Sequence, residues 1–248
     1  RLQGDTVSLP NLAVAKHLLA AAETVDDHPP QRQQALKILL GWDGQMDAGA
    51  PAPVIADMAR RRLLRDLLEP KLGEDWRSYN WWMAPVFLEN VLRNRPAGWL
   101  PLDQPGYDEF LLGSFDRAIE DILSQTRAPS LDRLRWGDQM QLRMTHPVGD
   151  RLPILRRWFS RSGRPQSGGR YTVKQTGRGF GPSERMVVDF GNLDASLLNT
   201  TLGQSGHVLS PHYADQFQAW YEVMGLANPF TEEAVAQATQ HTLYLRPQ

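Results

Sequence analysis

The sequence predicts an α+β protein, with a helical first half over residues 1–126 and a strand-rich second half over residues 127–248. In the first half, apolar side chains recur every three or four residues, which is the spacing of amphipathic helices. In the second half, short runs rich in β-branched and aromatic residues alternate with Gly/Pro loops, which is typical of strands. The sequence contains no internal repeat and no low-complexity stretch, so we treat the chain as one segment.

The helices of the first half are separated by clear breakers. Helical spacing predicts helices over residues 8–23, 31–40, 54–68, 75–93 and 107–125. Asp26-Asp27-His28-Pro29-Pro30 separates the first two, and Gly41 ends the second. Proline-punctuated loops are expected over residues 42–53 and 94–106.

The third helix carries a run of arginines. Arg60-Arg61-Arg62 and Arg65 are placed mostly on the face opposite Leu63, Leu64, Leu67 and Leu68. Such a run on an amphipathic helix usually forms a solvated face and less often an anion site. Both interpretations stay open at the level of sequence.

The second half reads as short strands between exposed loops. Strands are expected over residues 139–145, 170–175, 185–190, 196–202 and 242–245. Loops are expected over 160–169 and 177–182, and short helices over 212–224 and 231–240. Arg185 and Asp189 would share one strand face and form a structural pair.

Composition limits the class of protein. The 248 residues are 41% hydrophobic and 22% charged, as in a soluble globular protein, and they can bury a substantial core. A net charge of −1 favours neither a nucleic-acid nor a membrane-surface partner. No apolar run is long enough for a membrane span, and no signal peptide is visible in the first residues.

The chain has no cysteine, which excludes disulfides, thiolate metal sites and cysteine nucleophiles within it. Arg1-Leu2-Gln3-Gly4-Asp5 has no initiator methionine and resembles the middle of an element. We therefore expect a fragment or a processed product.

One stretch concentrates reactive side chains. Gly203-Gln204-Ser205-Gly206-His207 is followed by Ser210-Pro211-His212-Tyr213-Ala214-Asp215-Gln216. It begins like the G-x-S-x-G elbow of serine hydrolases, but His207 stands where that strained turn needs a small residue. Ser205, His212 and Asp215 also lie too close in sequence for a triad whose members normally come from separate elements. The favoured interpretation is a glycine turn whose polar side chains are hydrogen-bonded.

Metal and nucleotide sites have little support. His207, His212 and Asp215 are acceptable ligand types without a recognised ligand spacing. The segment from Asp43 lacks the sixth-position glycine of a calcium loop and has Val54 at its twelfth position. Gly177-Arg178-Gly179-Phe180-Gly181 is no phosphate-binding loop, and Glu120-Asp121 and Asp26-Asp27 are solvated charges. We predict no catalytic, cofactor-binding or metal-binding residue in this chain.

The order of landmarks along the chain is more specific than any single motif. The landmarks are Leu40-Gly41-Trp42-Asp43-Gly44, Trp136-Gly137, His146-Pro147, Tyr171-Thr172-Val173, Pro182-Ser183-Glu184-Arg185-Met186-Val187-Val188-Asp189-Phe190, the Gly203–Gln216 stretch, and Trp220. In this order they resemble the C-terminal part of the β subunit of the penicillin acylase (penicillin amidase) family of N-terminal-nucleophile hydrolases. The resemblance runs essentially from Arg1 to Pro247.

The resemblance implies a fold and a chemistry. It implies the C-terminal portion of an αββα sandwich, in a proenzyme that cleaves itself to expose a catalytic N-terminal serine. That serine, its α-amino base, the oxyanion donors and any Ca²⁺ ligands would lie upstream of this chain. The partners implied are the upstream α subunit, the N-terminal part of the β subunit and a small acyl amide substrate, in the periplasm or outside the cell.

The chain departs from the family pattern at two places. Met140 stands where family members commonly have a histidine after the Trp-Gly pair, and Ala50-Pro51 replaces a Ser-Ala helix start. Both changes concern local packing or pocket detail. An alternative is an inactive binding or interaction module on the same scaffold, which the aromatic content and the lack of a complete active site would suit.

Overall fold

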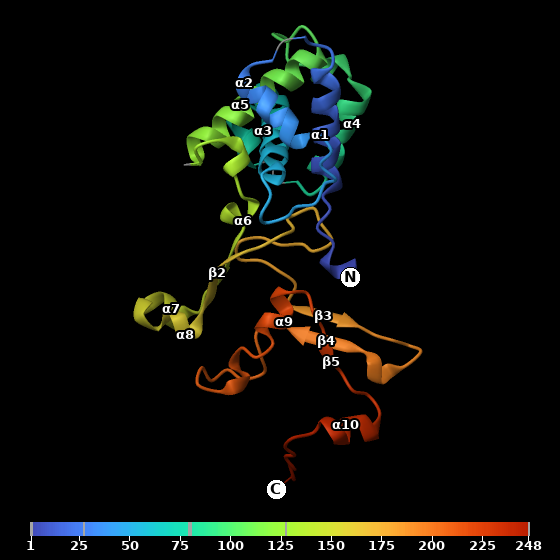
Figure 1. Ribbon diagram of the computed structural model, residues 1–248, viewed down its shortest axis with the longest axis vertical. Coiled ribbons are helices and arrows are strands. Elements are labelled where there is room, and N and C mark those ends of the chain that lie inside the picture. The colour runs from blue at the N-terminus through green and yellow to red at the C-terminus, as the bar shows by residue number, and fades with distance from the viewer. Residues whose placement is uncertain (1, 27, 79–80, 127, 248) are drawn as a thin grey trace. The chain divides into compact units, whose positions relative to one another are not determined.

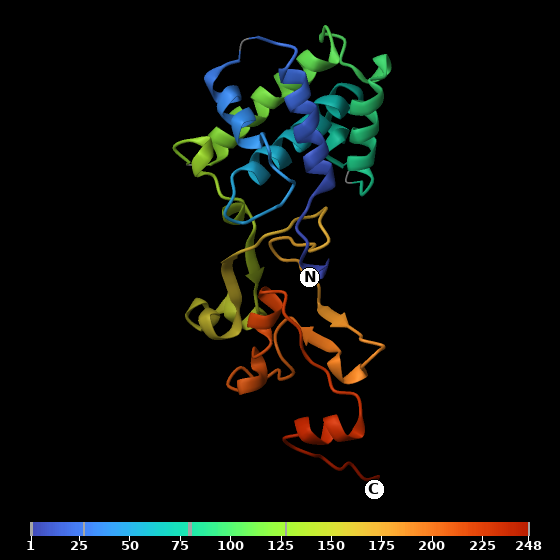
Figure 2. The same ribbon diagram turned by 45° about the vertical axis from the view of Figure 1, so that its right-hand side comes forward.

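A computed structural model describes residues 2–26, 28–78, 81–126 and 128–247. The chain divides into two compact units. We call residues 5–144 and 161–180 the helical unit, and residues 1–4, 145–160 and 181–248 the sheet unit. Figures 1 and 2 show the elements of each unit. The predicted α+β class is confirmed, with helices dominating the first part and two small antiparallel sheets following.

The helical unit is built on five helices that share one apolar core. They are α1 (Leu9–Ala22), α2 (Pro30–Leu39), α3 (Ala52–Leu72), α4 (Ala84–Asn94) and α5 (Tyr107–Gln125). Helix α3 packs against both α1 and α5 (Figure 1). The core side chains are buried as the helical spacing predicts, with Leu18, Leu63 and Phe115 fully enclosed.

Prolines and glycines set the helix ends. α1, α2, α3 and α4 each have a proline in the first turn, where its missing N–H costs nothing. α3 continues past the predicted end at residue 68 and stops at Gly73, whose φ of 56° is left-handed. The helix predicted over 75–93 is wrong in its first part. Gly73–Ser78 is a 3₁₀ turn and α4 begins at Ala84, which places Pro85 in the first turn, where its missing N–H breaks no helical hydrogen bond; residues 79–80 lie outside the described residues.

The helical unit ends in a small sheet. Short helix α6 (Trp136–Gln139) leads into β1 (Gln141–Met144), which pairs antiparallel with β2 (Arg161–Pro165). β2 corrects the loop predicted over 160–169. Pro165 is accommodated because β2 is an edge strand, and the left-handed Gly163 projects into open space.

The strand predicted over 170–175 is also wrong. These residues form turns closed by an isolated bridge between Gly169 and Gln175. The hydroxyl of Thr172 accepts from the Gly169 N–H and donates within the same loop. Side-chain hydrogen bonds of this kind satisfy the backbone locally and replace a strand ladder.

The sheet unit contains three antiparallel strands in the order β3 (Glu184–Val187), β4 (Leu197–Thr200) and β5 (Leu226–Ala227). Short helices α7 (Pro147–Arg151), α8 (Arg156–Phe159), α9 (Phe217–Tyr221) and α10 (Glu232–Ala238) accompany them. The predicted strands 185–190 and 196–202 are both present but shorter than expected. β3 begins one residue before its predicted start, and β4 lies inside its predicted range.

Three predictions in this unit need correction. The helix predicted over 212–224 is divided into a 3₁₀ turn at Pro211–Tyr213 and α9, because Gln216 binds the backbone of Leu202 and Thr200. Residues 242–245 form no strand and are exposed, since none of the described strands pairs with them. Arg185 does not pair with Asp189: its guanidinium donates to the Trp220 carbonyl, and Asp189 accepts from the N–H groups of Gly191 and Asn192.

No helix in the described part of the chain combines the length and apolar character needed to cross a bilayer.

Candidate functional site

The Gly203–Gln216 stretch forms a closed turn in the sheet unit. Ser205 N donates to the His212 carbonyl at 3.1 Å, while Ser205 Oγ accepts from His207 N at 3.1 Å. The His212 ring lies 2.9 Å from a carboxylate oxygen of Asp215, with the two side chains 59% and 41% exposed. Among the described residues, the serine hydroxyl therefore serves the turn, and the histidine and aspartate form a solvated pair.

Gly203 explains part of this geometry. A Cβ at this position would lie 2.2 Å from the His212 carbonyl oxygen and 2.6 Å from an Asp215 oxygen. Only glycine permits the two segments to approach so closely. The geometry is that of a hydrogen-bonded turn, and the expectation that these side chains are not catalytic stays a prediction. Across the described ranges, no three His, Asp or Glu side chains gather as metal ligands would.

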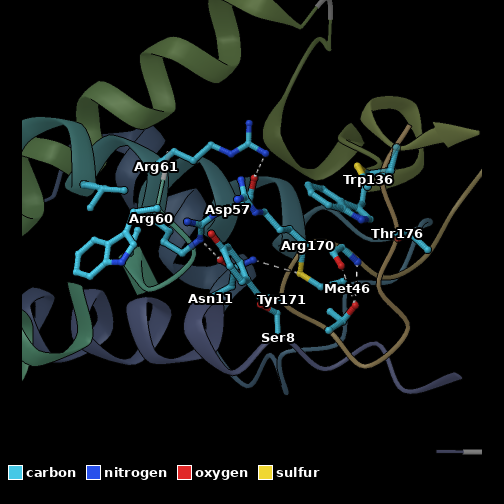
Figure 3. A pocket seen from close by; sticks show the side chains of 17 residues that line it. Ser8, Asn11, Met46, Asp57, Arg60, Arg61, Trp136, Arg170, Tyr171 and Thr176 are labelled. Atoms are coloured by element: carbon cyan, nitrogen blue, oxygen red, sulfur yellow. Dashed lines mark hydrogen bonds and ion pairs between the residues drawn. The ribbon is translucent and has the colours of Figure 1, made fainter. Parts of the chain in front are cut away.

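A pocket of about 440 Å³ lies wholly within the helical unit (Figure 3). Its walls come from the start of α1, the loop at Met46, α3, α6 and the loop over residues 169–177. This volume falls within the range of small-molecule sites. We call it the arginine pocket, after its lining residues Arg60, Arg61 and Arg170.

The 169–177 loop is held in place by hydrogen bonds from the Trp136-Gly137 landmark and its surroundings. Trp136 Nε1 donates to the Gly168 carbonyl at 2.8 Å, and Gly168 N donates to the Met46 carbonyl at 2.8 Å. Gly137 N donates to the Ala48 carbonyl at 2.8 Å, and a Cβ on Gly137 would lie only 2.5 Å from the Pro165 side chain. These bonds bring the loop carrying Arg170 and Tyr171 against α3.

A buried ion pair forms part of the pocket lining. Nη2 of Arg60 donates to Asp57 Oδ1 at 2.7 Å, and Arg60 Nε donates to Asn11 Oδ1 at 2.7 Å. Nη2 of Arg61 lies 2.7 Å from the other oxygen of Asp57. The side chains of Asp57 and Arg60 are each 7% exposed, whereas Arg61 is 61% exposed.

This arrangement differs from the solvated face that an arginine run on an amphipathic helix usually forms, although Arg61 itself is exposed. Arg60 is buried, and its neighbours form ion pairs: Arg62 with Asp66 and Asp121, and Arg65 with Glu69. Asp57 stands three residues before Arg60 and four before Arg61, so one turn of α3 aligns them. That spacing was visible in the sequence, but burial of the group depends on the 169–177 loop, which the helix pattern does not reveal.

Asp57 is ionised because its arginines outweigh its burial. Burial raises the pKa of the Asp57 carboxyl. Attraction to Arg60 and Arg61 and the hydrogen bond from Arg60 lower that pKa by more than burial raises it, so the net shift is downward. The pocket lining therefore includes a carboxylate flanked by two guanidinium groups.

Aromatic rings complete the walls. The Arg60 guanidinium lies 4.9 Å from the centre of the Tyr171 ring, and Arg170 lies 4.6 Å from the Trp82 ring. Trp81, Trp136 and Met140 also line the cavity, so the departure from the family pattern at Met140 falls in the pocket wall. Cations and aromatic faces placed together suit a planar anion.

The fold and the pocket define an α+β protein with a cationic, aromatic-lined cavity in a helical unit. The family model for penicillin amidase matches residues 1–237. The chain belongs to the penicillin amidase family.

Characterised relatives agree with this assignment. The chain is 28% identical, over 88% of its length, to the penicillin acylase 2 proenzyme of Pseudomonas sp. (strain SE83). It is 24% identical, over 93% of its length, to the acyl-homoserine lactone acylase QuiP of Pseudomonas aeruginosa, and 27% identical, over 84%, to that of Pseudomonas putida. It spans 29%, 32% and 28% of those three proteins, which is about a third of their length. The predicted family is confirmed, and its members are named as acyl-amide hydrolases.

Proposed function

We propose that this chain is the C-terminal part of the β subunit of an amidohydrolase that cleaves linear acyl amides. The substrates would be penicillins, N-acyl-homoserine lactones or related acyl amides, after the names of the relatives. The observation that carries the proposal is the family match over residues 1–237, in a chain that spans about a third of each relative.

The nucleophile in this proposal is an N-terminal serine upstream of residue 1. Its α-amino group takes the hydroxyl proton, the oxygen attacks the amide carbonyl, and the amine leaves with that proton to give an acyl-enzyme that water hydrolyses. Such an amine suits the role because it titrates near neutral pH. The engagement of Ser205 Oγ with His207 N supports placing the nucleophile elsewhere. Any Ca²⁺ of the full enzyme would be bound upstream as well.

The partners in this proposal are the α subunit and the N-terminal part of the β subunit. Met186, Leu198 and Leu226 are register partners on one face of the three-stranded sheet, and Met186 and Leu226 are 50% and 40% exposed. Apolar rows on strands are normally covered. Export to the periplasm or beyond belongs to the same proposal.

A second candidate is a binding module that keeps the scaffold without the chemistry. The arginine pocket favours it, since the cavity combines charge and aromatic walls without a nucleophile and base in hydrogen-bond contact among the described residues. The two candidates differ in whether the full-length protein turns over an acyl amide.

The deciding experiment assays full-length protein against penicillin G and an N-acyl-homoserine lactone. We expect hydrolysis that is abolished when the serine at the N-terminus of the mature β subunit is changed to alanine. Ser205→Ala and His212→Ala are the matched controls and should keep activity within about twofold, because both side chains serve a surface turn. Loss of activity in Ser205→Ala, with its unfolding midpoint unchanged, would place the nucleophile in this chain. No turnover of either substrate would favour the binding module.

A further inference from the structure

The side chains around the arginine pocket carry an excess of positive charge. Three arginines and one aspartate are among the described residues that line it, so these side chains sum to a net charge of +2. Asp57 is shared between Arg60 and Arg61, and Arg170 stacks on aromatic rings. Cationic clefts with low-dielectric walls attract anions.

Two donors in the pocket have capacity left for a ligand. Ser8 is 1% exposed, and its Oγ has no hydrogen-bond partner among the described residues. Ser8 is the N-cap residue of α1, yet its side chain makes no capping bond, and Pro10 removes one of the N–H groups it would ordinarily cap. Arg60 uses Nε and Nη2, and none of the described residues accepts from its Nη1. A buried hydroxyl without a partner is costly, and a ligand would relieve that cost.

The N-terminal end of α1 adds to the positive electrostatic potential in the pocket. Ser8 and Asn11, from the first turn of this 14-residue helix, both line the pocket. The N-terminus of a helix carries a partial positive charge and favours an anion nearby. Thus the helix end, the arginines and the buried hydroxyl all favour negative charge.

The walls determine what kind of anion fits. Trp81, Trp136, Tyr171 and Met140 give the cavity rings and a thioether side chain, which an inorganic ion would leave without contacts. Arginine binds planar carboxylates through paired N–H groups and stacks on aromatic faces. From these observations we propose that the arginine pocket binds a small aromatic or apolar carboxylate. The carboxylate lies between Ser8 Oγ and Arg60, and the ligand body lies against the aromatic wall.

Calorimetric titration of the full-length protein with benzoate tests this. Benzamide, which has the same shape without the charge, and inorganic phosphate, which has charge without the ring, are the comparison probes, all at matched ionic strength. We expect saturable binding of benzoate and at least about tenfold weaker binding of the other two, as for a lost charged hydrogen bond or a lost ring contact.

Variants locate the site. Ser8→Ala should raise the Kd of benzoate about tenfold and should not lower the unfolding midpoint of the ligand-free protein, because it removes a buried hydroxyl that has no partner among the described residues. Arg170→Gln should weaken binding as well. Arg65→Gln is the matched control, since it removes the same charge from an arginine of α3 outside the pocket that pairs with Glu69.

Three results would overturn the proposal. They are equal binding of benzoate and benzamide, phosphate binding as tightly as benzoate, or equal losses in Arg65→Gln and Arg170→Gln. Amide hydrolysis is not the readout here. Failure of this proposal is therefore distinguishable from failure of the proposed function.

Discussion

At the scale of single residues, the Asp57 carboxylate forms ion pairs with two of the three arginines that line the arginine pocket. It is enclosed by protein and neutralised by Arg60 and Arg61, and its own burial opposes ionisation. Removing one partner of a buried ion pair leaves the other charges uncompensated, which costs more than the pair itself contributes.

Asp57→Asn is therefore expected to lower the free energy of unfolding by about 3–5 kcal/mol, because the Arg60 guanidinium stays buried without its counter-charge. Urea unfolding at neutral pH measures the change. Glu69→Gln is the control: it breaks the ion pair of Glu69 with Arg65, which lies at the surface of the same helix, and should leave the midpoint within error. Equal effects of the two substitutions would contradict the burial-based argument.

The same residue predicts a pH dependence. The pKa of Asp57 is lower in the folded state than its ordinary value of 3.8, so its ionised form stabilises the fold above that value. This stabilisation is lost as the pH falls through the lowered folded-state pKa. The difference in stability between wild type and Asp57→Asn should accordingly be constant from pH 5 to 7 and narrow below pH 3.8, as followed by urea unfolding at each pH.

Sequence reasoning left the role of these residues open for a physical reason. The arginine run and the spacing of Asp57 were visible, and an anion site was one interpretation. Burial of Arg60 depends on Tyr171, which lies more than a hundred positions further along the chain and packs over the guanidinium. Ser8 is also typical of an N-cap by sequence, and only the structure shows that its hydroxyl does not cap the helix.

At the scale of elements, the loop after β2 depends on one glycine. Gly168 has a φ of 96°, its carbonyl accepts from Trp136, and a Cβ on it would lie 2.4 Å from the Lys174 carbonyl oxygen. Backbone strain and a backbone clash thus coincide at the position that holds the pocket wall.

Gly168→Ala should lower the free energy of unfolding by about 3 kcal/mol, from the left-handed conformation and the clash together. Gly163→Ala is the matched control. Gly163 has a similar φ of 80° but open space around it, so only the conformational cost of about 1 kcal/mol is expected. Denaturant unfolding of both variants separates the conformational cost from the cost of the clash. Equal losses of unfolding free energy would show that the clash is relieved by a small shift of the loop.

Helices were predicted better than strands because they depend on local signals. α5 begins and ends at the predicted residues 107 and 125, and the ends of α1 and α2 differ from the prediction by one residue. These helices were predicted well because the signals for them, apolar periodicity and prolines, lie within each helix. Strands require a partner. Residues 170–175 have strand composition, but Thr172 satisfies their backbone as a loop, whereas residues 161–165 pair with β1 despite Gly163 and Pro165.

At the scale of the whole molecule, the order of landmarks predicted the family better than any local chemistry did. The Gly203–Gln216 stretch, which looked like a nucleophile, an acid–base pair and a metal site together, is a hydrogen-bonded turn around Gly203. The stretch helped to predict the family through its position after the other landmarks along the chain.

The exposed sheet face makes the proposed subunit contacts testable. If the partners proposed above cover Met186, Met186→Lys places a charge in an interface, and the full-length protein should lose about 2 kcal/mol or more of stability. In isolated residues 1–248 the same side chain stays in water, so stability should be unchanged and self-association reduced. Thermal unfolding and light scattering of both forms measure these outcomes. Leu102→Lys, at a fully exposed loop position, should be neutral in both, and a neutral Met186→Lys in the full-length protein would show that this face is not part of the assembly.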